Sequence, residues 1–137
     1  SLRKYKDVNT TIAAQSSMNF WKPSRGYNST MRPDIVLNKG KEDCVVLDTK
    51  WKHIKNYNPS PQDLRQMFTY MKYYKAKRVA LLYPAVAFSR NHGRYYNHNE
   101  QNFQRLGEEE CSVISLPYNT DIRHCNTIST TCQQFNC

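Results

Sequence analysis

Two short apolar runs on either side of a polar turn constrain the fold of this chain most. Ile35–Leu37 and Val45–Leu47 flank the turn sequence NKGKED, as the two strands of a β-hairpin do. Because successive side chains on a strand point to opposite faces, three consecutive apolar residues make both faces of each strand apolar. The sequence therefore predicts a hairpin near the centre of a sheet, buried on both sides.

Charged residues at the open end of this hairpin conflict with burial. Asp34 precedes the first run, Asp48 follows the second, and Lys50 comes two residues later. If the turn is centred on Lys41, Asp34 lies directly opposite Asp48, with their Cβ atoms roughly 5 Å apart. Lys50 then emerges on the same face of the sheet. Because like charges in this arrangement are destabilising, a positive charge should lie between the two carboxylates.

Either the Lys50 ammonium group or a divalent cation could supply this charge. Asp34 and Asp48, together with the backbone carbonyl of Thr49 and water, would form the oxygen-rich, partly hydrated site that Mg²⁺ prefers, and Mn²⁺ should substitute for it. A bound metal polarises a phosphoryl oxygen and lowers the pKa of bound water, and Lys50 could orient that water, deprotonate it or stabilise the transition state. Phosphodiester hydrolysis requires this chemistry. The alternative is an ordinary solvent-exposed pair of Asp34 and Lys50.

A helix is predicted after the hairpin. Ser60 is a good N-cap, Pro61 suits the first helical position, and Asp63 in the first turn complements the helix dipole. We expect the helix to extend from Gln62 to Lys77. Its apolar residues share one face at helical spacing: Leu64, Met67, Phe68, Met71 and Tyr74.

Further strands complete a mixed α/β fold. We expect them over residues 9–21, 78–84 and 111–118, with a short strand or hairpin near the sequence GRYYN and a possible helix at the C-terminus. The order strand, hairpin, helix, strand, strand indicates a mixed sheet, with the helix connecting the hairpin to the following strand.

Length and hydropathy indicate a soluble domain. The 137 residues suit one domain, and the start at Ser1 suggests a piece of a longer protein. Val79–Phe88, the longest apolar run, is too short to cross a membrane, and the N-terminus lacks a signal-peptide core. We therefore expect a cytoplasmic location without membrane contact.

The charge is unevenly distributed and suits a polyanionic partner. The first 90 residues contain 17 Lys and Arg against 6 Asp and Glu, whereas the remainder contains 3 against 5. Such a basic body favours nucleic acid, although a solubilising surface explains the same numbers. Lys52, Arg65 and Lys72 are candidates for phosphate contacts, and each could equally be a solvated surface residue.

The hairpin sequence RPDIVL…CVVLDTKWK resembles the motif of the PD-(D/E)xK nuclease superfamily. In the helix, Gln66 and Tyr70 are similar to the QxxxY motif of the RecB-like branch. The resemblance implies a restriction-endonuclease-like α/β fold over residues 1–137, with a mixed central β-sheet, flanking helices and core motifs within 31–84.

Within that superfamily, segments 31–37, 45–52 and 60–84 resemble the nuclease domain of the McrC family. McrC is the cleavage subunit of McrBC-type restriction systems that act on modified DNA. The resemblance implies Mg²⁺-dependent cleavage of double-stranded DNA, with Asp34 and Asp48 as metal ligands, Lys50 as the catalytic lysine, and Gln66 and Tyr70 in support. It also implies an McrB-like AAA+ GTPase as partner, bound through a region that we do not find in this chain.

Two other functions remain open at this stage. One is a RecB-like exonuclease of a repair or CRISPR system, although the five cysteines are not spaced for an iron–sulfur cluster. The other is a catalytically silent module for DNA binding or assembly, against which the complete motif set argues. A zinc site formed by His124, Cys125, Cys132 and Cys137 has loose spacing.

Overall fold

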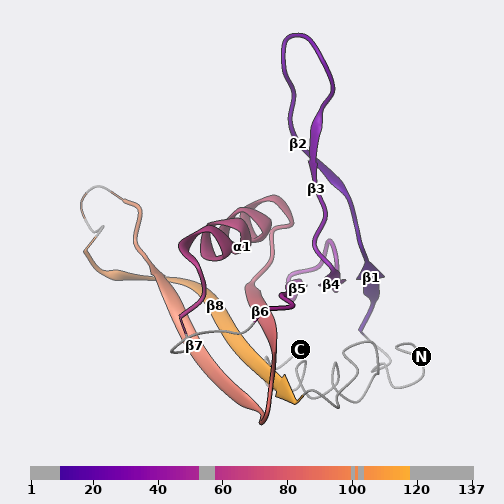
Figure 1. The fold of residues 1–137 in the computed structure, drawn as a ribbon. Coiled ribbons are helices and arrows are strands. Elements are labelled where there is room, and N and C mark those ends of the chain that lie inside the picture. Colours follow the sequence, from indigo (N-terminus) through magenta and orange to yellow (C-terminus); the bar gives the residue numbers. More distant parts are fainter. Residues whose placement is uncertain (1–9, 53–57, 100, 102–103, 118–137) are drawn as a thin grey trace.

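The computed structural model describes residues 10–52, 58–99, 101 and 104–117, and this part of the chain forms a six-stranded sheet with a helix on one face (Figure 1). The strand order is β1-β4-β5-β6-β8-β7. The central strands β5, β6 and β8 are parallel, and β1, β4 and β7 pair antiparallel with their neighbours. The elements of this sheet and its helix are β1 (Ile12–Ala14), β4 (Ile35–Leu37), β5 (Val45–Thr49), α1 (Pro61–Tyr73), β6 (Arg78–Ala85), β7 (Ser89–Tyr96) and β8 (Leu106–Pro117). The predicted mixed α/β class is confirmed.

The predicted hairpin and its register are confirmed. β4 pairs antiparallel with β5, and Val36 lies opposite Val46. Both faces of the hairpin are buried: Val36 and Val46 face α1, whereas Leu37 and Leu47 belong to a second apolar cluster. The chain therefore places this hairpin in the interior of the sheet, as its apolar residues require.

Helix α1 begins as predicted and ends earlier. The Ser60 hydroxyl accepts a hydrogen bond from the Asp63 backbone N–H at 3.0 Å, and Pro61 occupies the first turn. The helix ends at Tyr73 rather than Lys77. Lys75 adopts a left-handed conformation (φ 52°), and the Ala76 N–H closes the last turn on the Met71 carbonyl. This is a Schellman-type end, which glycine usually provides, so the prediction missed it.

The helix packs on β5, β6 and β8 through the middle of its apolar face. Met67, Met71 and Tyr74 are buried as predicted, whereas Leu64 and Phe68 are half-buried at the rim. Phe68 lies edge-on against Tyr95 of β7, with ring centroids 4.9 Å apart. The helix therefore spans the sheet from the hairpin to the β7 edge.

The single strand predicted over residues 9–21 is wrong. Gln15 adopts a left-handed conformation (φ 51°), which divides the segment into β1 and β2 (Met18–Trp21). β2 pairs antiparallel with β3 (Ser29–Met31), which is not among the predicted strands. These two strands form a separate ribbon that projects from the main sheet (Figure 1).

The C-terminal strands are longer than predicted. β8 begins at Leu106 rather than Cys111, because its polar first half pairs with β7, an eight-residue strand for which the sequence indicated only a short segment. The predicted C-terminal helix and the alternative zinc residues lie outside the described residues. Cys44 and Cys111 are buried free thiols. Within the described residues, no helix is long and apolar enough to span a membrane.

Replacing Met67 with alanine should strongly destabilise the fold. The Met67 side chain is fully buried between α1 and the sheet, so its truncation should lower the free energy of unfolding by about 2–5 kcal/mol. Urea denaturation followed by circular dichroism measures this change. The exposed Gln62 in the same helix offers a matched control, since Gln62→Ala should alter stability by less than about 0.5 kcal/mol. Equal effects of both substitutions would contradict the packing.

Candidate active site

Asp34, Asp48 and Lys50 meet at the open end of the β4–β5 hairpin. The Asp34 backbone N–H donates to Oδ1 of Asp48 at 3.3 Å, and Nζ of Lys50 lies 2.9 Å from Oδ2 of Asp48. The two aspartates are therefore neighbours across the hairpin, as the register predicted. The Lys50 ammonium group forms an ion pair with the Asp48 carboxylate.

Thr49 orients the Asp34 carboxylate. Its backbone N–H donates to Oδ2 of Asp34 at 2.8 Å, and its hydroxyl donates to the same oxygen at 2.5 Å. The next residue, Lys50, is fixed by its backbone N–H, which donates to the Leu82 carbonyl of β6 at 2.8 Å. The sheet thus sets the positions of both groups before any ligand binds.

The pKa of Asp48 is raised, chiefly because the carboxylate is buried. The hydrogen bond and positive charge of Lys50 lower it, and the negative charge of Asp34 raises it again. The neighbouring carboxylates of Asp34 and Asp48 are partly shielded from water and create a negative potential, which a bound cation would neutralise. Lys50 therefore neutralises only part of the negative charge at Asp48, and the remaining potential would favour binding of a cation.

Gln66 and Tyr70 of α1 extend this arrangement into a hydrogen-bonded chain. Nζ of Lys50 donates to Oε1 of Gln66 at 2.7 Å, and Nε2 of Gln66 donates to the Tyr70 hydroxyl at 3.1 Å. Burial, followed by the charges of Asp48 and Asp34, raises the pKa of Tyr70 to about 12. Tyr70 therefore stays protonated at neutral pH. The helix and the hairpin are joined through these side chains.

Asp63 lies in the same site as Asp48 and Lys50, although the sequence analysis assigned it only an interaction with the helix dipole. Its carboxylate is 2.8 Å from Nζ of Lys52 and 3.6 Å from Nζ of Lys50, and the Tyr83 hydroxyl donates to it at 3.4 Å. The sequence feature that indicates its place in the site is its position three residues before Gln66, which puts both side chains on one face of the helix. We call Asp34, Asp48, Lys50, Asp63, Gln66 and Tyr70 the carboxylate cluster.

Lys50 is protonated in this cluster. Burial lowers the pKa of Lys50. The hydrogen bond and charge of Asp48, together with the charge of Asp63, raise this pKa by more, so the net shift is upward. An ammonium group with a raised pKa cannot readily accept a proton at neutral pH. Of the roles considered for Lys50, electrostatic stabilisation suits this environment better than general-base catalysis.

The residues predicted to contact phosphates are spread over three environments. Lys52 pairs with Asp63 at the cluster, with about half of its side chain exposed. Lys72 pairs with Glu109 of β8 at 2.8 Å and lies 5.1 Å from the centre of the Phe68 ring. Arg65 is exposed on α1. Only Lys52 is thereby brought into contact with the cluster.

The donor set of the cluster fits a hard divalent cation. Within the described residues, no three or more His, Cys, Asp and Glu side chains are arranged to hold a metal ion together. A cation at the cluster would therefore have only two side-chain ligands, Asp34 and Asp48. A backbone carbonyl such as that of Thr49 and water would complete its shell. Such a small set of oxygen ligands is typical of Mg²⁺, which retains several waters.

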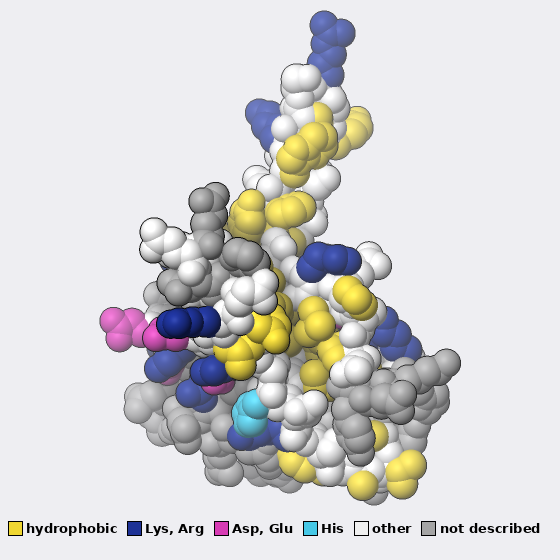
Figure 2. Space-filling model, turned by 90° about the vertical axis from the view of Figure 1, so that its left-hand side faces the viewer, with side chains coloured by type: hydrophobic (Ala, Val, Ile, Leu, Met, Phe, Trp, Pro, Cys, Tyr) yellow, Lys and Arg dark blue, Asp and Glu magenta, His cyan; other side chains and the backbone are white. Residues whose placement is uncertain are grey.

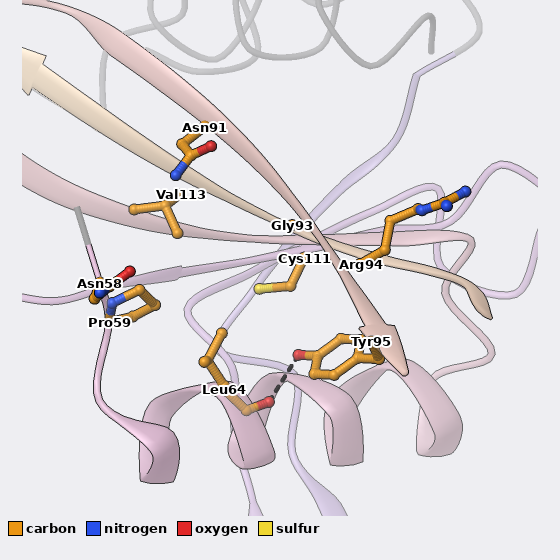
Figure 3. Close-up of a pocket in the computed structure, with 9 residues that line it drawn as sticks. All are labelled: Asn58, Pro59, Leu64, Asn91, Gly93, Arg94, Tyr95, Cys111 and Val113. Carbon is orange, nitrogen blue, oxygen red and sulfur yellow. Dashed lines mark hydrogen bonds between the residues drawn. The ribbon is translucent and has the colours of Figure 1, made fainter. Parts of the chain in front are cut away.

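A cavity of about 200 Å³ lies elsewhere, between α1 and strands β7 and β8 (Figure 3). Leu64, Cys111 and Val113 line it, and the Tyr95 hydroxyl donates to the Leu64 carbonyl across it at 2.7 Å. Burial raises the pKa of the Cys111 thiol to about 11, so this thiol is unreactive at neutral pH. The cavity contains none of the predicted site residues.

The fold and the cluster together define a class: a mixed α/β domain in which a central hairpin and the following helix assemble two carboxylates, a lysine and a glutamine. Residues 1–84 match the family described as "McrBC 5-methylcytosine restriction system component". The chain therefore belongs to this family, and the predicted relationship to McrBC-type restriction systems is confirmed.

A solved structure shares the fold. The chain is similar to one in the "Refined half-complex from tetradecameric assembly of Thermococcus gammatolerans McrB AAA+ hexamers with bound McrC", with a TM-score of 0.60 and 15% sequence identity. The similarity covers 93% of this chain and 29% of the other, so this chain spans less than a third of that protein. No curated protein matches the chain.

Replacing Asp63 with asparagine should make stability less dependent on pH. Although burial raises the pKa of Asp63, its interactions with Lys52, Ser60 and Lys50 lower it more. The carboxylate therefore stabilises the fold above the unfolded pKa of about 4, and this stabilisation is lost as the pH falls through the lower folded value. We expect Asp63→Asn to cost about 1–2 kcal/mol at pH 7 and clearly less at pH 3.

Urea denaturation of the wild type and the variant across this pH range measures the difference. The exposed Glu42 in the hairpin turn provides the control, because Glu42→Gln removes a carboxylate without a described ion pair. A cost of Asp63→Asn that does not change with pH would show that its charge is not involved.

Proposed function

We propose that this domain hydrolyses DNA phosphodiester bonds with Mg²⁺ as cofactor, as the nuclease part of an McrC-like subunit. The observation that carries the proposal is the joining of Asp34, Asp48, Lys50 and Gln66 at one end of the sheet. These residues come from a hairpin and the helix after it, in the order of the PD-(D/E)xK motif. Membership in the McrBC family supports the same function.

The positions of the motif residues also support a PD-(D/E)xK fold. Asp34 immediately precedes β4. Asp48 is the second-last residue of β5, and Lys50 directly follows that strand. The helix that carries Gln66 and Tyr70 then crosses to a parallel strand, β6. A hairpin, a helix and a parallel strand in this order match the core that the motif implies.

The two aspartates and the lysine have different roles in the proposed reaction. When bound, Mg²⁺ would polarise the phosphoryl oxygen and lower the pKa of a bound water. Asp34 and Asp48 would hold the ion, and Thr49 fixes the direction of the Asp34 carboxylate. Lys50, kept protonated, would stabilise the negative charge that develops at phosphorus.

Gln66 acts on the lysine rather than on the substrate. It accepts a hydrogen bond from Lys50 and donates one to Tyr70, so it holds the ammonium group beside Asp48. Asp63 shares Lys50 with Asp48 on the helix side. These contacts would preserve the geometry of the lysine when a phosphate approaches.

An McrB-like AAA+ GTPase is the proposed partner. The similar structure is described as McrB AAA+ hexamers with bound McrC, and this chain belongs to the McrBC family. Double-stranded DNA is the proposed substrate, and the basic charge of the first 90 residues favours it. Family membership favours a restriction system over a RecB-like exonuclease.

Replacing Asp48 with asparagine should abolish metal binding. The substitution removes one of two charged ligands, so we expect Mn²⁺ affinity to fall at least 100-fold, by about 3 kcal/mol. Anomalous diffraction from Mn²⁺-soaked crystals and isothermal titration test the site. Glu42→Gln, which removes an exposed carboxylate on the same hairpin, should leave the metal signal unchanged. A wild-type chain that binds no Mn²⁺ at millimolar concentration would leave the silent module as the better function.

Replacing Lys50 with alanine should separate metal binding from catalysis. The variant keeps both carboxylates, so Mn²⁺ should bind at least as tightly as in the wild type, because a competing cation has been removed. Cleavage of modified duplex DNA, assayed with the same substitution in a full-length McrC-like subunit together with its McrB-like partner and GTP, should fall at least about 100-fold. Unchanged cleavage in this variant would contradict a catalytic role for Lys50.

A further inference from the structure

The ribbon formed by β2 and β3 is a basic arm that the proposed reaction does not use. We define the arm as residues 16–32. It contains Lys22, Arg25 and Arg32 and no Asp or Glu. Figure 2 shows it projecting from the body, with basic side chains toward its end and hydrophobic ones along its length.

The arm exposes aromatic side chains that its own folding does not require. Tyr27 is 96% exposed, and Trp21 is 59% exposed. Lys22 and Arg25 are exposed, and neither forms an ion pair within the described residues. Adjacent unpaired cations and large aromatic groups on a projecting element indicate a binding surface.

The base of the arm is fixed to the body. The Tyr74 hydroxyl at the end of α1 donates to the Ser16 carbonyl, and the Phe20 ring lies 5.5 Å from the Tyr73 ring, edge to face. Met31 is buried, and Met18 packs against the same apolar cluster. A two-stranded ribbon is marginally stable by itself, so these contacts give it a defined direction.

The arm begins beside the carboxylate cluster. Its second strand ends at Met31, three residues before Asp34, and the Gln15 N–H just before its first strand donates to the Asp34 carbonyl at 2.9 Å. From Met31 to Arg25 the chain spans at most roughly 20 Å, the length of a fully extended segment, because residues 24–26 form a bend. This upper limit equals about six base pairs of duplex at roughly 3.4 Å each.

From this geometry, we propose that the arm binds double-stranded DNA within about half a helical turn of the phosphate that the cluster cleaves. The major groove is wide enough for a two-stranded ribbon. Lys22 and Arg25 contact phosphates, and the exposed aromatic side chains lie against sugars and base edges. The inference rests on the proposed nuclease function for the position of the cut, whereas DNA binding by the arm is measurable without cleavage.

The test compares two double variants of the 137-residue chain. Lys22→Gln with Arg25→Gln removes two charges from the arm. The control, Lys41→Gln with Lys77→Gln, removes two exposed charges at the opposite end of the β4–β5 hairpin. Fluorescence anisotropy with a labelled 30-base-pair duplex, without divalent metal, gives the affinity as a function of salt concentration. Urea denaturation confirms that both variants are folded.

We expect the arm variant to bind duplex about tenfold more weakly, and its log–log salt dependence to be shallower by about 1.8, because two phosphate contacts are lost. The control variant should retain nearly the wild-type affinity and slope. Equal loss in the two variants, or an unchanged slope in the arm variant, would overturn the proposal.

Two further measurements separate the arm from the nuclease function and from a protein interface. Asp48→Asn should lose cleavage while retaining the arm-dependent binding of duplex, so failure of either function is recognised independently. Size-exclusion chromatography of the chain alone should give the same elution volume for the wild type and the arm variant. A change of oligomeric state in the arm variant, together with intact DNA binding, would show that the arm contacts protein and would overturn the proposal.

Discussion

The antiparallel pairing of β4 with β5 is the constraint on which the rest of the site depends. Its register places Val36 opposite Val46 in the core and brings Asp34 against Asp48 at the open end. A shift of one residue would move each apolar side chain to the other face of the sheet and separate the carboxylates. Burial of the hairpin on both faces therefore holds the two charges together despite their repulsion.

Lys50 links this hairpin to the helix. It contacts Asp48 on the sheet and Gln66 and Asp63 on α1, so a single ammonium group balances carboxylates from two elements. The same contacts raise its pKa and hold it in place. In the proposed reaction, a lysine that is held in place by hydrogen bonds before the substrate binds would meet the condition for electrostatic catalysis.

The arm and the cluster are connected through the backbone. The segment between Gln15 and Asp34 leaves the sheet, forms the ribbon, and returns to the cluster. A change in how the arm is held would therefore be felt at Asp34, because the Gln15 N–H bonds to its carbonyl. If the arm binds duplex DNA as proposed, this connection would link contacts along the duplex to the geometry of the cluster.

The sequence by itself determined the hairpin, its register, the start of α1 and the pairing of the two aspartates. These features depend on two short runs of consecutive apolar residues around a polar turn and on local capping, which act between residues close in the sequence. The early end of α1 and the division of residues 9–21 were missed, because Lys75 and Gln15 adopt left-handed conformations that only glycine would have signalled.

Only the tertiary structure decided which charges share the site. Asp63 and Lys52 meet because α1 lies across the sheet, and no spacing along the chain shows that contact. The projection of the arm was likewise absent from the sequence pattern. It follows from the packing of Phe20 and Tyr74 side chains at its base, and long-range packing is not encoded in any local periodicity.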